Sequence, residues 1–314
     1  MYLQHFGLSQ FPFTLTPNTE FFFGLAPHVE ALQVLQTAIE TGEGFIKVTG
    51  EVGTGKTLVC RKLLSDLPTQ YYCAYLPNPY LTPVELRWAV ANELKVDAPG
   101  DTNQQQLTLL IQKRLMELHQ KGYHVILVLD EAQSLPDDSI EALRLFTNLE
   151  TESSKLLQVV LFGQQELDER LSTAKFRQLR QRITFSYHLR PLSWDEVQAY
   201  MLHRLKVAGY QGNNLFTEAD VKFLAKAARG IPRLVNILAH KSLLLCFGEG
   251  AKQVSIKHCR GAVIDTEDVE LQSVVSNRYK WGWLLALLVA IAAVVSGIQQ
   301  DCCSDLLARM RDLI

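Results

Sequence analysis

Residues 50–57 have the sequence GEVGTGKT, which matches the phosphate-binding pattern G-x-x-x-x-G-K-[ST] at every fixed position. A short β-prone run at residues 45–49 precedes it, and residues 57–67 follow as a predicted helix with leucines on one face. Glycines adopt backbone angles that other residues avoid, so several amide N–H groups can turn inward around a phosphate at the positive end of the helix. The stretch therefore predicts a phosphate-binding loop between a strand and a helix. The alternative is a chance match in a glycine-containing turn.

Each part of this loop has an expected role in binding a nucleotide. We expect Lys56 to reach the β- and γ-phosphates, and the hydroxyl of Thr57 to bind Mg²⁺, which prefers oxygen ligands. The residues expected to contact the nucleotide are Gly50, Glu51, Val52, Gly53, Thr54, Gly55, Lys56, Thr57 and Leu58.

An acidic pair follows a second apolar run, HVILVLDE at residues 124–131. The five apolar residues 125–129 are too few for an independent helix and are typical of a strand covered on both faces. We expect Asp130 to hold Mg²⁺ and Glu131 to polarise a water for attack on the γ-phosphate. An acidic turn after a strand is the alternative. Together the two motifs predict an ATPase or GTPase, and the absence of a guanine-specifying N-K-x-D pattern favours ATP.

Composition and charge are those of an ordinary globular protein of 314 residues with a net charge of -2. This charge provides no global basic field, which argues weakly against a nucleic-acid partner. The six cysteines show no zinc-site spacing, and four of them lie in apolar stretches typical of buried thiols. We interpret these four cysteines as reduced, cytosolic core residues.

Strands and helices are predicted to alternate along the first 190 residues. The expected strands are 45–49, 71–76, 125–129, 156–162 and 184–189, and the expected helices are 27–41, 57–67, 83–94, 104–120 and 137–149. This alternation predicts an α/β fold, a mostly parallel sheet with helices on both faces and ligands at the carboxyl ends of the strands. The pattern then changes to amphipathic helices alone, which indicates a separate helical lid. These helices are expected at 194–208, 217–228, 232–247 and 255–264.

The first 26 residues are dense in aromatic side chains and in turn residues, and we expect an irregular lead-in that packs on the core. Stacking on an adenine base is one interpretation of these aromatics, and plain packing is the other. They are Phe6, Phe11, Phe13, Phe21, Phe22 and Phe23.

Two further polar residues could face the nucleotide. Gln164 follows the predicted strand 156–162, where it could orient the attacking water or could simply cap the next helix. Arg233 follows Pro232, a residue suited to a first helical turn, so its side chain projects from a helix start. It could fold back onto the γ-phosphate or lie at the surface.

Residues 281–298 are uncharged and almost entirely apolar. As a helix they would be about 27 Å long, close to the hydrocarbon thickness of a bilayer. Aromatic residues 279, 281 and 283 suit a membrane interface, and the basic flank at Arg278 and Lys280 favours a cytoplasmic amino-terminal side. We therefore expect one transmembrane helix, with a buried core helix as the alternative. The Cys302-Cys303 pair beyond it would meet an oxidising compartment.

The chain resembles the AAA+ ATPases over about residues 30–265, on the strength of the two nucleotide motifs, Gln164, the arginines of FRQLRQRI and the GIPR element at 230–233. More narrowly, the stretches YLQHFGLSQFPF, VLDEAQ, LFGQQEL and LRQRI are similar to the A-component ATPases of the general secretion pathway, and within them to the ATPases of mannose-sensitive haemagglutinin (MSHA) pilus biogenesis. The resemblance assigns Lys56 and Thr57 to Walker A, Asp130 and Glu131 to Walker B, Gln164 to sensor 1, Arg233 to sensor 2, and the arginine finger to Arg182, with Arg180 as the alternative.

The expected organisation has six parts. They are an aromatic lead-in (1–26), the P-loop AAA+ domain (27–191), the lid (192–270), a linker (271–280), the transmembrane helix (281–298) and a short extracytoplasmic tail (299–314). Secretion-pathway members often carry a peptidoglycan-binding domain beyond the membrane helix, and the 16-residue tail has no room for one.

The resemblance implies a homo-oligomeric ATPase of the bacterial inner membrane, with its ATPase domain in the cytoplasm. It would couple hydrolysis of ATP with Mg²⁺ to assembly of a pilus or a secretion machine, and a membrane partner would supply the peptidoglycan-binding domain. Two other hypotheses remain. One is a DNA-directed AAA+ protein of the helicase-loader or transposition type, and the other is a slow nucleotide switch that barely turns over.

Overall fold

The computed structural model describes residues 2–16, 18–146, 155–212 and 214–269. The chain divides into two compact units, residues 1–262 and 263–314, and only residues 263–269 of the second are described. The expected linker, membrane span and tail at 271–314 lie outside the described residues. Within the described part, no helix combines the length and the apolar character needed to cross a bilayer.

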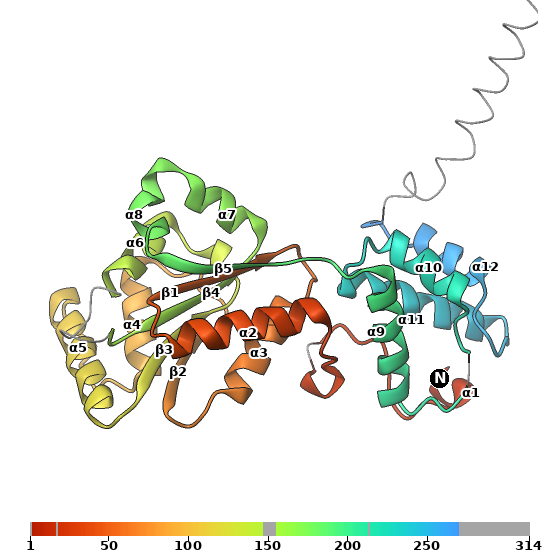
Figure 1. The fold of residues 1–314 in the computed structure, drawn as a ribbon, viewed down its shortest axis with the longest axis horizontal. Helices are drawn as coiled ribbons and strands as arrows, with labels where there is room; N and C mark the ends of the chain where they lie inside the picture. The colour runs from red at the N-terminus through yellow and green to blue at the C-terminus, as the bar shows by residue number, and fades with distance from the viewer. Residues whose placement is uncertain (1, 17, 147–154, 213, 270–314) are drawn as a thin grey trace, which may run out of the picture. The chain divides into compact units, whose positions relative to one another are not determined.

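Residues 45–189 build a five-stranded parallel sheet, as the alternation of elements predicts (Figure 1). The strands are β1 (Phe45–Gly50), β2 (Tyr71–Leu76), β3 (His124–Leu129), β4 (Gln158–Gly163) and β5 (Ile183–Leu189), in the spatial order β2-β3-β4-β1-β5. All pairings are parallel. Because β4 lies between β1 and β3, the carboxyl ends of these three strands meet at one edge of the sheet.

Alternate residues of each strand face two separate hydrophobic cores. On β4, Val159 and Leu161 enter one core, while Val160 and Phe162 enter the other. The first core is completed by α4 (Pro83–Glu93), α5 (Gln104–Gln120), α6 (Asp137–Phe146), α7 (Gln165–Ser172) and α8 (Arg177–Arg180), and the second by α2 (Ala26–Glu40) and α3 (Lys56–Asp66). Burial on both faces explains why the central strands β3 and β4 are nearly continuous apolar runs. At roughly 1.5–3 kcal/mol per buried aliphatic or aromatic side chain, this packing fixes the strand ends that carry the site.

The segment after β5 contains helices and no strand within the described residues 194–269. Its members, here called the lid helices, are α9 (Trp194–Val207), α10 (Glu218–Ala227), α11 (Pro232–Gly248) and α12 (Ile256–Ile264). All four begin and end within one residue of the predicted positions. Capping boxes explain two of the starts, since Ser193 pairs with Glu196 and Thr217 with Asp220.

The aromatic lead-in packs mainly against the lid helices. It includes two short helical elements, α1 (Tyr2–Phe6) and the 3-10 turn η1 (Thr19–Phe21), so it is more regular than expected. The ring of Tyr2 lies 5.5 Å from the ring of His240 on α11, and its hydroxyl is 3.0 Å from Nδ1 of that histidine. Phe23 stacks on His203 of α9 at 4.6 Å. These contacts correspond to the packing interpretation of the aromatics.

Some details of residues 45–189 differ from the prediction. Strand β4 begins at Gln158 rather than at 156, and the buried side-chain amide of Gln158 donates to the carbonyls of Ile39 and Glu43. Strand β5 begins one residue early, at Ile183, and the short helices α7 and α8 were not among the predicted elements.

Candidate active site

The loop from Gly50 to Gly55 joins β1 to α3, as its pattern predicts. Gly53 and Gly55 have φ angles of 83° and 103°, a region that other residues rarely adopt. A Cβ on Gly53 would come within 2.5 Å of the Cβ of Arg233, and one on Gly55 within 2.9 Å of Nε2 of His28. Both positions therefore require glycine for backbone angle and for space.

Lys56 is the buried cation of this loop, with 5% of its surface exposed. Its Nζ donates hydrogen bonds of 2.9 Å to the carbonyls of Gly50 and Glu51. Burial lowers the pKa of Lys56, while the carboxylates of Glu131 and Asp130 act in the opposite direction. Helix α3 begins beside it with no side-chain cap, so its first N–H groups and the positive end of its dipole are available to bind an anion.

Asp130 and Thr57 are adjacent, as expected for two ligands of one cation. Asp130 is 2% exposed, and it accepts hydrogen bonds from the Thr57 hydroxyl and from the Glu131 N–H. Burial raises the pKa of Asp130 against the effect of those hydrogen bonds. The Thr57 hydroxyl and the Asp130 carboxylate are oxygen donors, and they fit Mg²⁺, which is usually held by one or two protein oxygens together with water and phosphate.

Glu131 directly follows Asp130 in the chain and has a left-handed backbone conformation, with a φ of 53°. Its Oε2 accepts hydrogen bonds from the side-chain amides of Gln133, at 2.5 Å, and Gln164, at 3.2 Å. The Gln164 N–H in turn donates to Oε1 of Gln133 at 3.0 Å. These bonds fix the amide orientation of Gln133 and hold the carboxylate of Glu131 at the carboxyl ends of β3 and β4.

Gln164 occupies the N-cap position of α7, but its side chain makes no capping bond. Gln164 is thus the N-cap residue by position and through its backbone carbonyl, while its side-chain amide contacts Glu131. Gln133 is a site residue that the sequence interpretation missed. Its only signal was a glutamine two positions after the acidic pair in VLDEAQ.

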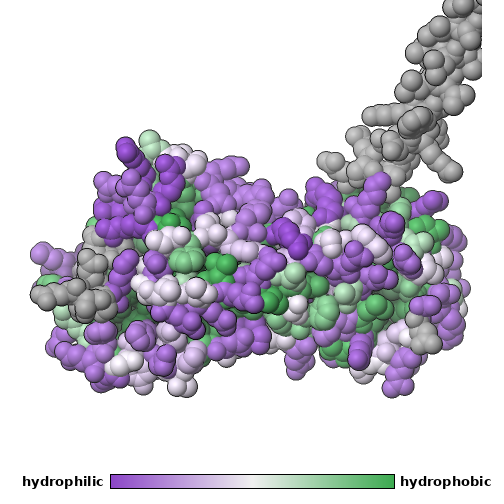
Figure 2. Space-filling view, viewed as in Figure 1, coloured by the Kyte–Doolittle hydropathy of each residue, from purple (hydrophilic) through white to green (hydrophobic). Residues whose placement is uncertain are grey.

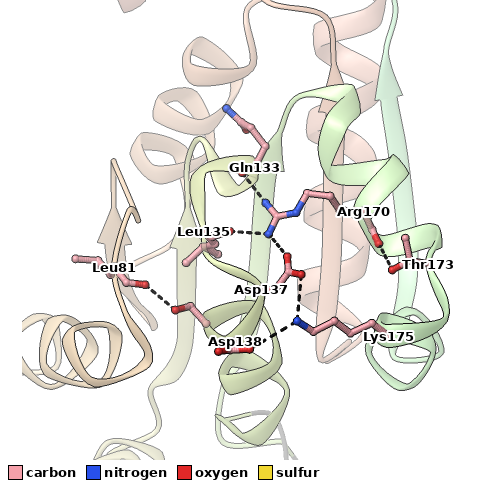
Figure 3. Close-up of polar contacts among 9 residues, drawn as sticks. Leu81, Gln133, Leu135, Asp137, Asp138, Arg170, Thr173 and Lys175 are labelled. Carbon is pink, nitrogen blue, oxygen red and sulfur yellow. Dashed lines mark hydrogen bonds and ion pairs between the residues drawn. The ribbon is translucent and has the colours of Figure 1, made fainter.

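Arg170 on α7 ties this region together (Figure 3). Its guanidinium donates to the carbonyls of Gln133 and Leu135, both at 2.7 Å, and to the carboxylate of Asp137 at 2.5 Å. Lys175 reaches the other oxygen of Asp137 at 3.1 Å. Helix α7, whose N-cap residue is Gln164, is thus joined to the segment that follows Glu131.

A pocket extends from this loop toward the lead-in and the lid helices. Its cavity volume is about 200 Å³, which is smaller than the roughly 300–1,000 Å³ typical of ligand sites. Its lining residues are Thr14, Leu15, Thr16, Asn18, His28, Val52, Gly53, Gly55, Lys56, Thr57, Leu58, Glu131, Tyr200, Arg204, Pro232, Arg233 and Asn236. Residues 14–16 and 18 of the lead-in thus line the pocket. None of the six lead-in phenylalanines is among the described lining residues.

The other expected loop residues shape the loop. Thr54 is buried, and both its N–H and its hydroxyl donate to the carbonyl of Glu51. Gly50 and Glu51 hold the amine of Lys56 through their carbonyls. Val52 and Leu58 line the pocket.

The three predicted arginines lie in different places. Arg233 lines the pocket, and its backbone N–H donates to the Gly53 carbonyl at 3.2 Å. Arg180 and Arg182 do not line this pocket, as the structure describes it. Arg180 donates to the carbonyl of Ser172, and Arg182 to that of Arg144. They lie at the α8 end of the domain, where hydrophilic side chains gather on the face seen in Figure 2.

The strand order, the glycine loop and the acidic pair define a P-loop domain with the AAA fold, and a family model described as AAA domain matches residues 39–171. The chain is similar to General secretion pathway protein A of Aeromonas hydrophila, with 39% identity over 295 residues that cover 94% of this chain and 52% of that protein. It therefore spans about half the length of this relative.

Solved structures show the same fold at low sequence identity. Cdc6p from Pyrobaculum aerophilum superposes with a TM-score of 0.59 at 20% identity, covering 79% of this chain and 70% of that one. The ORC2 protein of Aeropyrum pernix gives a TM-score of 0.58 at 14% identity, covering 82% and 74%. The similarity to General secretion pathway protein A supports the narrower resemblance seen in the sequence, without singling out MSHA pilus biogenesis.

Proposed function

We propose that this protein is a membrane-anchored ATPase that couples Mg²⁺-dependent ATP hydrolysis to assembly of a secretion or pilus machine. The observation that carries the enzymatic part is the Glu131 carboxylate. It is held by Gln133 and Gln164 beside Asp130 and Thr57, at the carboxyl ends of β3 and β4. The similarity to General secretion pathway protein A supports the cellular part.

The residues have separate roles in this reaction. Lys56 and the first N–H groups of α3 neutralise the β- and γ-phosphates. Thr57 and Asp130 hold Mg²⁺, which supplies charge neutralisation to the phosphates when bound. Glu131 polarises the attacking water and takes its proton. Gln164 orients that water, and Arg233 approaches the γ-phosphate from the start of α11.

The site is completed between copies in this proposal. Arg182, or Arg180 in its place, enters the pocket of a neighbouring subunit, because neither lines the pocket of its own chain. A guanidinium has fixed charge and forked donors that suit a phosphoryl group in transfer. The working form is therefore a homo-oligomer, a ring or a similar assembly.

Anchoring is assigned to residues 281–298, on their apolar sequence and basic flank. The protein is then a single-pass protein of the bacterial inner membrane with its ATPase domain in the cytoplasm. We further propose that it acts with a membrane partner, one that carries a peptidoglycan-binding domain, and that MSHA-type pilus biogenesis is one such system.

Affinity purification from detergent-solubilised membranes tests the cellular role. Glu131→Gln should trap nucleotide and partners together, and the eluate should contain pilus or secretion components. The same purification with Lys56→Ala is the control, since that variant should lose nucleotide and retain fewer partners. An eluate without such components from either variant would contradict the proposed role.

A DNA-directed function is the second candidate, because structures with this fold include the ORC1 protein of Aeropyrum pernix in complex with DNA. The net charge of -2 argues against it. Retention of the protein on DNA that weakens steeply with salt would favour it, because phosphate contacts release counterions. We expect no such retention.

A further inference from the structure

We propose that His28 reads the base of the bound nucleotide, with its Nδ1 accepting a hydrogen bond from the exocyclic amino group of adenine. This inference rests on the proposed function, since it assumes that a nucleoside triphosphate occupies the P-loop site. It makes His28 a specificity-determining residue that favours ATP over inosine and guanosine triphosphates.

His28 lies in the first turn of α2 and lines the pocket beside the phosphate loop. Only 3% of the residue is exposed. Its Nε2 is 3.0 Å from the carbonyl oxygen of Thr54. A carbonyl can only accept a hydrogen bond, so Nε2 carries the hydrogen in this pair.

The other ring nitrogen, Nδ1, is then an acceptor whenever the ring is neutral. Burial lowers the pKa of His28, while the Thr54 carbonyl and the charge of Glu196 act in the opposite direction. Nδ1 is buried and has no hydrogen-bond partner among the described residues. Leaving such an acceptor unpaired is unfavourable. A donor supplied by a ligand would satisfy it.

The position of His28 in the pocket points to the base rather than to the phosphates. The phosphates are assigned to Lys56 and the start of α3. A bound nucleotide would therefore extend its base toward the remaining walls, which are formed by His28, Leu58, the lead-in and the lid helices.

The other buried polar side chains on those walls already make hydrogen bonds within the protein. Tyr200 donates to Oδ1 of Asn236 at 3.0 Å, and Arg204 donates to the Tyr200 hydroxyl at 2.9 Å. The Asn236 amide donates to the carbonyl of Thr14 at 3.3 Å. Of the buried polar side chains that line the described pocket, His28 is the one with an unpaired atom.

An acceptor at Nδ1 of His28 would distinguish adenine from other purines by the group at C6. Adenine presents an amino donor at its C6 position, whereas hypoxanthine and guanine present a carbonyl oxygen there. Two acceptors facing one another repel and leave both unpaired, and sites built on such bonds discriminate strongly. We expect the dissociation constant to rise at least about 10-fold from ATP to inosine triphosphate, by the usual effect of an unsatisfied buried acceptor.

The test compares two variants that separate the ring nitrogens. In His28→Gln the amide nitrogen can take the place of Nε2 and keep the bond to Thr54, but Nδ1 is lost. In His28→Asn the side-chain oxygen can take the place of Nδ1, but the bond to Thr54 is lost. Thermal unfolding first establishes that both full-length variants are folded.

Dissociation constants are measured for ATP, purine riboside triphosphate and inosine triphosphate, by competition against a fluorescent nucleotide labelled on its ribose. Purine riboside triphosphate has no group at C6 and serves as the neutral probe. We expect wild type to prefer ATP by about 10-fold or more, His28→Gln to lose that preference while still binding inosine triphosphate, and His28→Asn to keep it.

An ATP preference that is unchanged in His28→Gln would overturn the inference, as would equal weakening of all three nucleotides. Either result leaves the proposed function standing, because wild type still binds ATP. If wild type binds none of the three nucleotides, the proposed function fails and this inference fails with it.

Discussion

At the scale of single residues, the direction of the Glu131 carboxylate depends on two glutamine amides. A non-glycine residue in the left-handed region is strained by roughly 1–3 kcal/mol and persists only where its surroundings hold it. Gln133 and Gln164 both donate to Oε2, and they are also bonded to each other. They therefore position the carboxylate that is proposed to activate water.

Gln133→Ala should lower kcat for ATP hydrolysis by about 10-fold, a barrier increase of about 1.4 kcal/mol, and should leave the affinity for ATP unchanged. The reason is that the Glu131 carboxylate remains but is no longer held in place by the Gln133 amide. Steady-state hydrolysis and nucleotide titration measure the two quantities. Gln165→Ala, an exposed neighbour at the start of α7, is the matched control and should match wild type. Weaker ATP binding with an unchanged kcat in Gln133→Ala would show that the amide serves the pocket instead.

Some site residues could be predicted from sequence, and others could not. Lys56 and Thr57 could be, because a loop that wraps a phosphate fixes their spacing along the chain. Gln133 and His28 could not, because their roles depend on Gln164 and Thr54, which are 31 and 26 residues away. Contacts of that separation exist only once the sheet has assembled. The lead-in phenylalanines left two interpretations open, because either stacking on a base or packing on the protein satisfies an aromatic ring.

At the scale of elements, Arg170 joins α7 to the loop that carries Glu131 (Figure 3). The neighbouring cations, Arg170 first and then Lys175, hold the pKa of Asp137 below its ordinary value. Any stability that this contributes is present above the ordinary carboxyl pKa. It is lost as pH falls through the lowered value.

Arg170→Lys should slow hydrolysis and lower the free energy of unfolding by about 1–2 kcal/mol. Lysine keeps the charge but cannot bond Gln133, Leu135 and Asp137 together, and partial exposure reduces the effect. Urea unfolding and steady-state hydrolysis measure both effects. Lys175→Ala is the control, because it removes the more exposed cation of the same carboxylate and should change neither quantity. Equal effects of the two variants would mean that only the charge around Asp137 matters.

Most elements could be predicted because their patterns are local. Three of the lid helices, α9, α10 and α11, begin at capping boxes or at Pro232. The strands β3 and β4 are apolar because helices cover both faces of the sheet. Helix α7 escaped prediction because it is short, with only Leu167 and Leu171 buried. Two apolar positions do not establish a helical period.

At the scale of the whole molecule, the proposed span at 281–298 has a direct test. The full chain should stay with membranes under alkaline extraction, because about 18 apolar residues buried in a bilayer resist removal. A truncation after Ser276 should be soluble and still bind ATP. Loss of the full chain from alkali-washed membranes would mean that residues 281–298 form a core helix.

The shared site can be tested by mixing two inactive variants. Arg182→Ala and Glu131→Gln should each bind ATP without hydrolysing it. In mixed oligomers, some interfaces pair an intact Glu131 with the intact Arg182 of a neighbour, and these should turn over. A mixture that stays inactive, although mixed oligomers form, would exclude Arg182 as a finger acting between subunits, and Arg180→Ala would then be mixed in its place.

Lys56 is proposed to bind the nucleotide and Glu131 to perform the hydrolysis, and one paired measurement separates these two roles. ATP affinity and ATP turnover are determined for Lys56→Ala and for Glu131→Gln, with wild type as reference. Lys56→Ala should lose both, because the phosphate charge loses its buried cation. Glu131→Gln should bind ATP as wild type does and turn over at least about 100-fold more slowly, as expected for loss of a general base. Equal loss of ATP affinity in the two variants, or turnover at the wild-type rate in Glu131→Gln, would contradict the account.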